Sequence, residues 1–196
     1  MRVAVLDYGM GNLRSVAKAL EAAGADVVVT SSSAEVDRSD ALCVPGQGIF
    51  GRCMANLAAA EQDDLIRGWI DDQRPYLGIC LGMQILFDSS EEQRGGAAST
   101  GLSIFPGVVR RLRGDVRIPH MGWNEVNDEH YYFDHSYAVW PRDDSLVSGW
   151  CWHGERFAAS IRSGSVTAVQ FHPEKSAAAG LALLSDWTAA LEEAAV

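Results

Sequence analysis

The segment around Cys80 constrains the fold of this chain more than any other stretch. Residues 76–79 form an apolar run typical of a buried strand, and residues 81–87 continue with apolar positions at helical spacing. Cys80 lies at the junction, with Gly78 and Gly82 two residues away on either side. This Gly-x-Cys-x-Gly pattern predicts a tight strand-turn-helix elbow, because glycines tolerate strained backbone angles and let strand and helix approach closely.

The elbow leaves two roles open for Cys80. At a helix N-terminus, free N–H groups and the macrodipole favour a thiolate over a thiol, which would make the residue a nucleophile. The N–H of Leu81 is then placed to stabilise an oxyanion. The alternative is packing, because free cysteine is among the most buried residue types. The elbow alone does not decide between them.

The first half of the chain repeats a short apolar run, a glycine-containing loop and an amphipathic helix. This alternation is typical of βαβ units, so we expect an α/β fold with a central, mostly parallel sheet flanked by helices. Ligands bind such sheets at the carboxyl ends of the strands, where Cys80 and the loop at 46–48 are expected. The predicted strands span residues 2–6, 27–30, 41–44 and 76–79, and predicted helices begin at Leu13, near residue 65 and at Leu81.

The second half of the chain has a different pattern. A polar, glycine-rich stretch at 91–100 predicts a mobile loop, and short apolar runs separated by turns then predict antiparallel or mixed strands. These runs span residues 108–112, 131–133, 138–140, 149–153, 157–161 and 166–171. A final helix is expected over 176–195, with a buried stripe of Leu181, Leu184, Trp187 and Leu191.

Composition and charge limit the classes of partner. At 196 residues we expect one domain, and the net charge of −10 argues against nucleic acid or an anionic membrane as the main partner. No signal peptide is expected, and no apolar run approaches the roughly 18 residues that a membrane span requires. Cys43, Cys53 and Cys151 show no metal-binding spacing, so we expect packing residues in a reducing, cytoplasmic compartment, with no metal and no cofactor.

A thiolate nucleophile needs a base, and His172 is the best candidate. It follows a predicted strand, so it should lie at the same sheet edge as Cys80. Glu174 follows two residues later, and Pro173 stiffens the turn between them. A carboxylate bonded to one ring nitrogen would leave the other nitrogen facing the sulfur. The alternative is a surface His-Pro-Glu turn that caps the last helix.

Together these motifs resemble the class I (triad) glutamine amidotransferases. That family has a Pro-Gly-x-Gly loop, a Gly-x-Cys-x-Gly-x-Gln elbow and a strand-terminal His-Pro-Glu, and this chain has all three in order. The resemblance implies the flavodoxin-like fold of that family. It also implies a glutaminase in which Cys80 attacks L-glutamine, His172 transfers protons and Glu174 orients His172.

The resemblance also assigns roles to residues around the triad. Backbone N–H groups of Leu81 and of the loop Gly46, Gln47 and Gly48 would form the oxyanion hole. Gln47 departs from one branch of the family, described in the next paragraph, which commonly has an aliphatic residue at this position. Basal glutaminase activity or its control is therefore expected to differ. Substrate-binding positions map to Gln84, Glu92, Ser136 and Tyr137. Without the resemblance, Glu92 would be read as one charge in a solvated loop.

Three further runs resemble one branch of the family, whose members pass ammonia to a (β/α)8-barrel cyclase in a heterodimer. The runs are residues 7–16, 119–124 and 132–137. Positions at that interface map to Asn12, Trp123, Tyr132 and Lys175. From the sequence alone, Trp123 could equally be a core aromatic residue.

Two alternatives remain open at this point. One is a different triad amidotransferase, such as the pyridoxal phosphate synthase glutaminase, although the Gly-Trp-Asn and His-Ser-Tyr runs disfavour it. The other is an inactive module that only binds glutamine or a partner. Intact Cys80, His172 and Glu174 disfavour that module, and Gln47 leaves it open.

Overall fold

The computed structural model describes residues 1–92 and 100–194. Most of the mobile loop predicted at 91–100 therefore lies outside the described residues.

A large mixed sheet organises the chain. Its parallel half runs in the order β2 (Asp26–Thr30), β1 (Arg2–Leu6), β3 (Ala41–Gly46), β4 (Tyr76–Cys80) and β12 (Val166–Val169). It continues through antiparallel pairs to β11 (Glu155–Ser163), β9 (Tyr137–Pro141) and β6 (Phe105–Arg111), with β5 (Phe87–Ser90) parallel to β6 at the edge. The predicted parallel sheet with antiparallel strands in the second half of the chain is confirmed.

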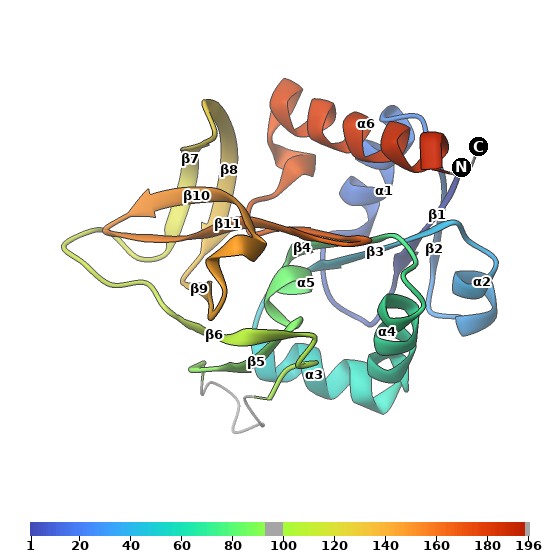
Figure 1. Cartoon of the computed structure of the whole chain (residues 1–196), viewed down its shortest axis with the longest axis horizontal. Helices are drawn as coiled ribbons and strands as arrows, with labels where there is room; N and C mark the ends of the chain where they lie inside the picture. Colours follow the sequence, from blue (N-terminus) through green and yellow to red (C-terminus); the bar gives the residue numbers. More distant parts are fainter. Residues whose placement is uncertain (93–99, 195–196) are drawn as a thin grey trace.

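Two strands form a separate hairpin, β7 (His120–Val126) with β8 (Glu129–His135). It stands beside β10 (Val147–His153), which pairs with β11 (Figure 1). The sequence does not predict β7, because its exposed and buried residues alternate around glycine and aromatic positions without an apolar run.

Helices cover both faces of the parallel half of the sheet (Figure 1). The helices α1 (Leu13–Ala22) and α6 (Ala177–Ala194) lie on one face, and α3 (Phe50–Ala59) and α4 (Gln62–Asp71) lie on the other. Alternation along β1 supplies both cores: Val3 and Val5 pack with α1 and α6, while Ala4 and Leu6 pack with α3 and α4. The run at 2–6 therefore reads as continuously apolar because both faces of its strand are buried.

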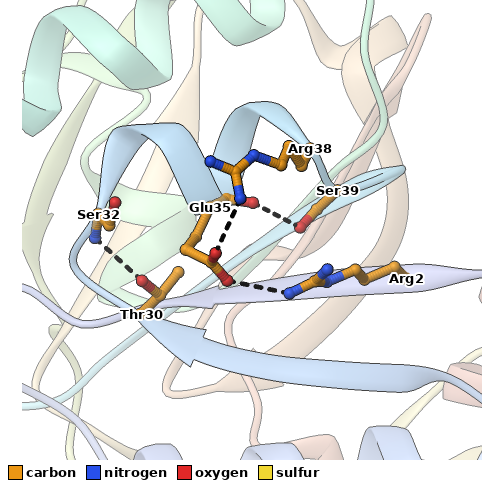
Figure 2. A network of polar contacts seen from close by, with 6 residues as sticks. All are labelled: Arg2, Thr30, Ser32, Glu35, Arg38 and Ser39. Atoms are coloured by element: carbon orange, nitrogen blue, oxygen red, sulfur yellow. Dashed lines mark hydrogen bonds and ion pairs between the residues drawn. The ribbon is translucent and has the colours of Figure 1, made fainter.

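The short helix α2 (Ser33–Asp37) is fastened to the start of β1 by a surface network (Figure 2). Glu35 accepts from the guanidinium of Arg2 at 2.9 Å and from that of Arg38 at 3.3 Å. The Ser39 hydroxyl donates to the backbone oxygen of Glu35 at 3.0 Å. Such ion pairs near the surface contribute only about 0–1 kcal/mol. Arg2 lies at the amino-terminal end of β1, whereas Cys80 lies at the carboxyl end of β4.

Three sequence-based expectations need correction. The helix predicted over 81–87 is the single turn α5 (Leu81–Gln84), because the backbone oxygens of Ile85 and Leu86 accept from residues 102–105 and lead the chain into β5. The sequence predicts no helix between the loop at 46–48 and residue 65, but α3 begins at Phe50. Leu181 is 39% exposed rather than buried, since the first turn of α6 packs Gly180 against Pro173 instead.

The elbow fits only because glycines line the approach of β4 and α5 to β3. A Cβ on Gly82 would overlap the backbone oxygen of Val44, and one on Gly78 would lie 2.5 Å from the oxygen of Gly82. A Cβ on Gly46 would lie 2.5 Å from the Cβ of Leu81. The collision predicted from the sequence at Gly78 and Gly82 is confirmed.

A pair of glycine substitutions tests this packing. Gly82→Ala should destabilise the protein by about 3 kcal/mol or more, because the backbone of Val44 cannot yield to the new Cβ. Gly68→Ala, in the middle of α4 with open space around it, should stabilise by about 0.5–1 kcal/mol through helix propensity. Urea unfolding of both variants measures the difference. Equal stability of the two variants would contradict the account.

Candidate active site

Cys80 occupies a strained position at the carboxyl end of β4. Its backbone angles are φ 55° and ψ −105°, in the left-handed half of conformational space where side chains other than glycine are rare. Such strain persists only where the surroundings fix it, and it is concentrated at functional sites. Here the glycine-lined contact with β3 fixes it, and the sulfur lines a cavity at the carboxyl ends of the strands.

His172 and Glu174 meet in the interior beside Cys80. β12 runs parallel to β4, with Val169 opposite Ile79, so the chain beyond β12 reaches the same sheet edge as the elbow. His172 Nδ1 lies 2.9 Å from Glu174 Oε1, and His172 is only 1% exposed. The alternative of a surface turn is therefore wrong.

The contact between imidazole and thiol is loose. Among the described residues, Nε2 of His172 makes no hydrogen bond of standard geometry. The thiol of Cys80 is nevertheless close enough to influence the imidazole pKa. Catalytic contacts are often long before a substrate binds, so the geometry fits a base that faces its nucleophile.

The surroundings of His172 favour its protonated form. Burial alone would lower the pKa of His172, but the neighbouring Cys80 sulfur and the hydrogen-bonded Glu174 carboxylate outweigh burial and raise the pKa to about 10. At neutral pH the imidazole therefore keeps its proton, with the Glu174 carboxylate bonded to Nδ1 and the Cys80 sulfur near Nε2. A protonated imidazole in this position can give a proton to a leaving group once the sulfur has attacked.

A cavity of about 540 Å³ opens over Cys80. All four predicted substrate-binding residues line it, as do two of the three loop residues and Leu81. Gly46 lies behind the lining, packed on Leu81 and on the hydroxyl of Tyr8. The lining therefore contains Gln47, Gly48, Leu81, Gln84, Glu92, Ser136 and Tyr137.

Glu92 is held in place rather than solvated. It is 8% exposed, and its Oε2 accepts from the backbone N–H of Phe50, the first residue of α3, at 2.9 Å. The interpretation of Glu92 as a solvated loop charge is thus wrong. A fixed carboxylate in the cavity wall suits a cationic group of a ligand.

Sequence reasoning missed Gln170, which donates from Nε2 to the sulfur of Cys80 at 3.5 Å. A signal for it was present, because residues 170 and 172 lie two apart in an extended run and so share a side. Gln84 joins the same contact, donating to Gln170 Oε1 at 2.9 Å.

Three of the four predicted interface residues gather outside the cavity. Trp123 is 54% exposed, so the core alternative is wrong. Its ring meets that of Tyr132 edge-on at 6.2 Å, and the Lys175 ammonium lies 5.8 Å from the Tyr132 ring centre. Asn12 instead caps α1, accepting from the N–H of Ser15 at 3.4 Å.

The other three cysteines are buried and unpaired, as predicted for packing residues. Burial raises the pKa of the Cys53 and Cys151 thiols to about 12, and that of Cys43 further. Within residues 1–92 and 100–194 there is no group of side chains suited to hold a metal ion. Nor does any helix of that part of the chain have the length and apolar character to cross a membrane.

Comparisons with known proteins agree with this architecture. The sequence model of the family described as glutamine amidotransferase class-I matches residues 4–189. The imidazole glycerol phosphate synthase subunit HisH of Leifsonia xyli subsp. xyli is 43% identical, covering 96% of this chain and 98% of that relative. The protein of the same name from Aquifex aeolicus is 44% identical, covering 95% and 96%.

Solved structures share the fold at lower identity. A crystal structure of a glutamine amidotransferase superposes with a TM-score of 0.73 at 19% identity, covering 95% of this chain and 98% of its own. The glutaminase domain of Trypanosoma brucei CTPS superposes with a TM-score of 0.59 at 19% identity, covering 98% and 94%. These likenesses show the fold alone.

The charge state of His172 predicts how stability depends on pH. Because its pKa is raised on folding, its contribution is fully present below about pH 6.5 and is lost as pH rises toward 10. Between pH 6.5 and 8.5 the free energy of unfolding of the native protein should therefore fall relative to His172→Gln, by at most about 1.4 kcal/mol per pH unit. Urea unfolding at three pH values measures this. A difference between the two proteins that stays constant or grows with pH contradicts it.

Proposed function

This chain belongs to the class-I glutamine amidotransferases, and from that premise we propose that it is the glutaminase subunit of an imidazole glycerol phosphate synthase, acting as one amidotransferase domain in histidine biosynthesis. The observation that carries the proposal is the buried His172–Glu174 pair beside Cys80, which lines a cavity. Relatives at 41–44% identity over at least 94% of this chain carry that subunit's name.

The first half-reaction uses Cys80 as a thiolate and His172 as an imidazolium. The Cys80 thiolate attacks the side-chain amide carbon of glutamine, and the carbonyl electron pair moves onto oxygen. The imidazolium of His172 then protonates the departing nitrogen, so that ammonia leaves and a glutamyl thioester remains. Glu174 holds the ring through Nδ1 and balances its charge.

The second half-reaction regenerates the Cys80 thiolate and the His172 imidazolium. His172, now neutral, takes a proton from water, and the resulting hydroxide attacks the thioester. The carbon–sulfur bond breaks with its electron pair returning to Cys80, and the product becomes glutamate as its new carboxyl group gives its proton to solvent. The imidazole keeps the proton from water, which restores the starting state.

An oxyanion hole at the elbow would stabilise both tetrahedral intermediates. The N–H of Leu81 directly follows the nucleophile, and the loop Gly46, Gln47 and Gly48 lies against it, with Gly48 at φ +111°. One such donor is typically worth about 3–4 kcal/mol of transition-state stabilisation. The position of this loop therefore affects the rates of both half-reactions.

The cavity wall offers groups for the α-ammonium of glutamine. The Glu92 carboxylate suits the ammonium. Both hydrogens of the Gln84 amide are used, on Tyr137 O and on Gln170 Oε1, so Gln84 presents only its oxygen and also suits a cation. Ser136 and Tyr137 complete the proposed substrate-binding set.

The partner proposed for this chain is a cyclase with a (β/α)8 barrel, which would receive the ammonia before water does. The exposed side chains of Met121 and Trp123 on β7, beside Tyr132 and Lys175, offer an apolar centre with a cation for such an interface. Asn12 belongs to the same proposal. An inactive binding module is disfavoured because the triad is intact and buried.

Loss of the sulfur tests the chemistry. In the presence of the cyclase partner with its nucleotide ligand, Cys80→Ala should lower glutamate release about a thousandfold or more, because no other group can form the thioester. Cys151→Ala, a buried cysteine in β10, should keep native activity. Glutamate release by Cys80→Ala at the native rate would rule out the mechanism.

The interface has its own test. Trp123→Ala should weaken binding to the cyclase partner roughly thirtyfold, as expected when an aromatic anchor is truncated. Val29→Ala removes another exposed apolar side chain, on β2 at the far edge of the sheet, and should leave the affinity unchanged. Isothermal titration calorimetry compares them. Native affinity in Trp123→Ala would place the interface elsewhere.

A further inference from the structure

Gln170 is a buried amide in direct contact with the nucleophile, and the triad does not include it. It is 0% exposed and follows β12, where its own backbone N–H donates to Ala159 O at 2.8 Å. Its Nε2 lies 3.5 Å from Cys80 Sγ, a normal distance for a hydrogen bond to sulfur. A glutamine side chain in the core must satisfy both ends of its amide, so the direction in which it points matters.

The direction of the Gln170 amide follows from one backbone carbonyl. Tyr137 O can only accept, so the group of Gln84 that lies 2.9 Å from it must be the NH2. The second hydrogen of that NH2 points to Gln170, 2.9 Å away, which must therefore present its oxygen. The NH2 of Gln170 is left facing the sulfur.

The same carbonyl also orients two histidines. His135 Nδ1 lies 2.9 Å from Tyr137 O and must donate, which makes its Nε2 the acceptor of the His120 Nδ1–H at 3.0 Å. His120 Nε2 then accepts from the Asn124 amide at 3.2 Å. Burial lowers the pKa of His120 to about 4 and that of His135 to about 3, so both rings are neutral, as this arrangement requires.

We propose that Gln170 is an N–H donor that stabilises the Cys80 sulfur as a thiolate, and that Gln84 is a positioning residue that fixes the direction of the Gln170 amide. Asn124 on β7, His120 and His135 form a hydrogen-bond chain that ends on the Tyr137 carbonyl oxygen. The same oxygen accepts from Gln84.

This donor meets a need that the elbow leaves unfilled. The helix that follows Cys80 is one turn long, so few peptide dipoles are aligned toward the sulfur. A hydrogen bond from an amide to a charged acceptor is stronger than one between neutral groups, so it favours the thiolate over the thiol. Its role in turnover rests on the proposed function: sulfur carries negative charge before the amide is attacked and again when the carbon–sulfur bond of the thioester breaks.

Alkylation of Cys80 by iodoacetamide tests the hydrogen bond without glutamine or a cyclase partner. Because only the thiolate reacts, the rate reports its population. Gln170→Met keeps a side chain of similar length, loses the donor to the sulfur and adds no charge. In this variant alkylation at pH 7 should slow about tenfold, and the pH midpoint should rise by roughly one unit, with the high-pH plateau unchanged.

A matched control separates this effect from general loss of packing. Gln62 is also a buried glutamine, with Nε2 donating to Asp7 O and Ser31 O, and it does not contact the sulfur. Gln62→Met should leave the pH midpoint of Cys80 alkylation unchanged. Gln84→Met should raise the midpoint by less than Gln170→Met, because the Gln170 amide then loses the contact that orients it. Peptide mass spectrometry assigns the label to Cys80.

Several outcomes would overturn the proposal. A native midpoint in Gln170→Met would remove the donor role, and a native midpoint in Gln84→Met would remove the positioning role. A lower alkylation rate at the high-pH plateau, with an unchanged pH midpoint, would mean that the substitution displaced the sulfur, which would contradict the donor role. If the variants do not fold, the 1H–15N resonances of the Gln170 amide in the unmutated protein must move when Cys80 is alkylated, and unmoved resonances refute the contact. If the pH midpoints of alkylation shift as predicted but the unmutated protein shows no glutaminase activity, only the proposed function is refuted.

Discussion

The contact between the elbow and β3 is the constraint on which the rest of the site depends. Gly82 lies against the backbone of Val44, and Gly46 lies against Leu81, so β4 and α5 are held where no side chain would fit. This contact keeps Cys80 at a positive φ that a free chain would leave. It also aims the sulfur toward the segment that follows β12, where Gln170 and His172 lie on the same side of the chain.

Buried histidines of this protein shift their pKa values in opposite directions for a simple reason. His172 faces the sulfur of Cys80 and is hydrogen-bonded to the carboxylate of Glu174, and these contacts outweigh burial and raise its pKa. His120 and His135 face each other and neutral amide or carbonyl groups, so burial dominates and their pKa values fall. A charged ring serves proton transfer, whereas neutral rings with one fixed tautomer serve as structural hydrogen-bonding groups.

Much of the fold and the core of the site could be predicted from the sequence because local signals were strong. The buried strands were marked by apolar runs, and Cys80, His172 and Glu174 lay in short motifs whose spacing has a physical cause. The sequence could not reveal where α5 ends, because the carbonyls of Ile85 and Leu86 accept hydrogen bonds from residues 102–105. The spacing of Gln170 to His172 indicates the side on which Gln170 lies, but it does not identify the atoms that Gln170 contacts on Gln84 and Cys80, 86 and 90 residues away in the chain.

The protonation state of His172 at neutral pH tests the central claim most directly. The 15N chemical shifts of its two ring nitrogens, measured at pH 7.5 in the unmutated protein without ligand, distinguish an imidazolium from a neutral ring. The account predicts two protonated nitrogens, one donating to Glu174 and one facing the sulfur of Cys80. A neutral ring with one unprotonated nitrogen would contradict it.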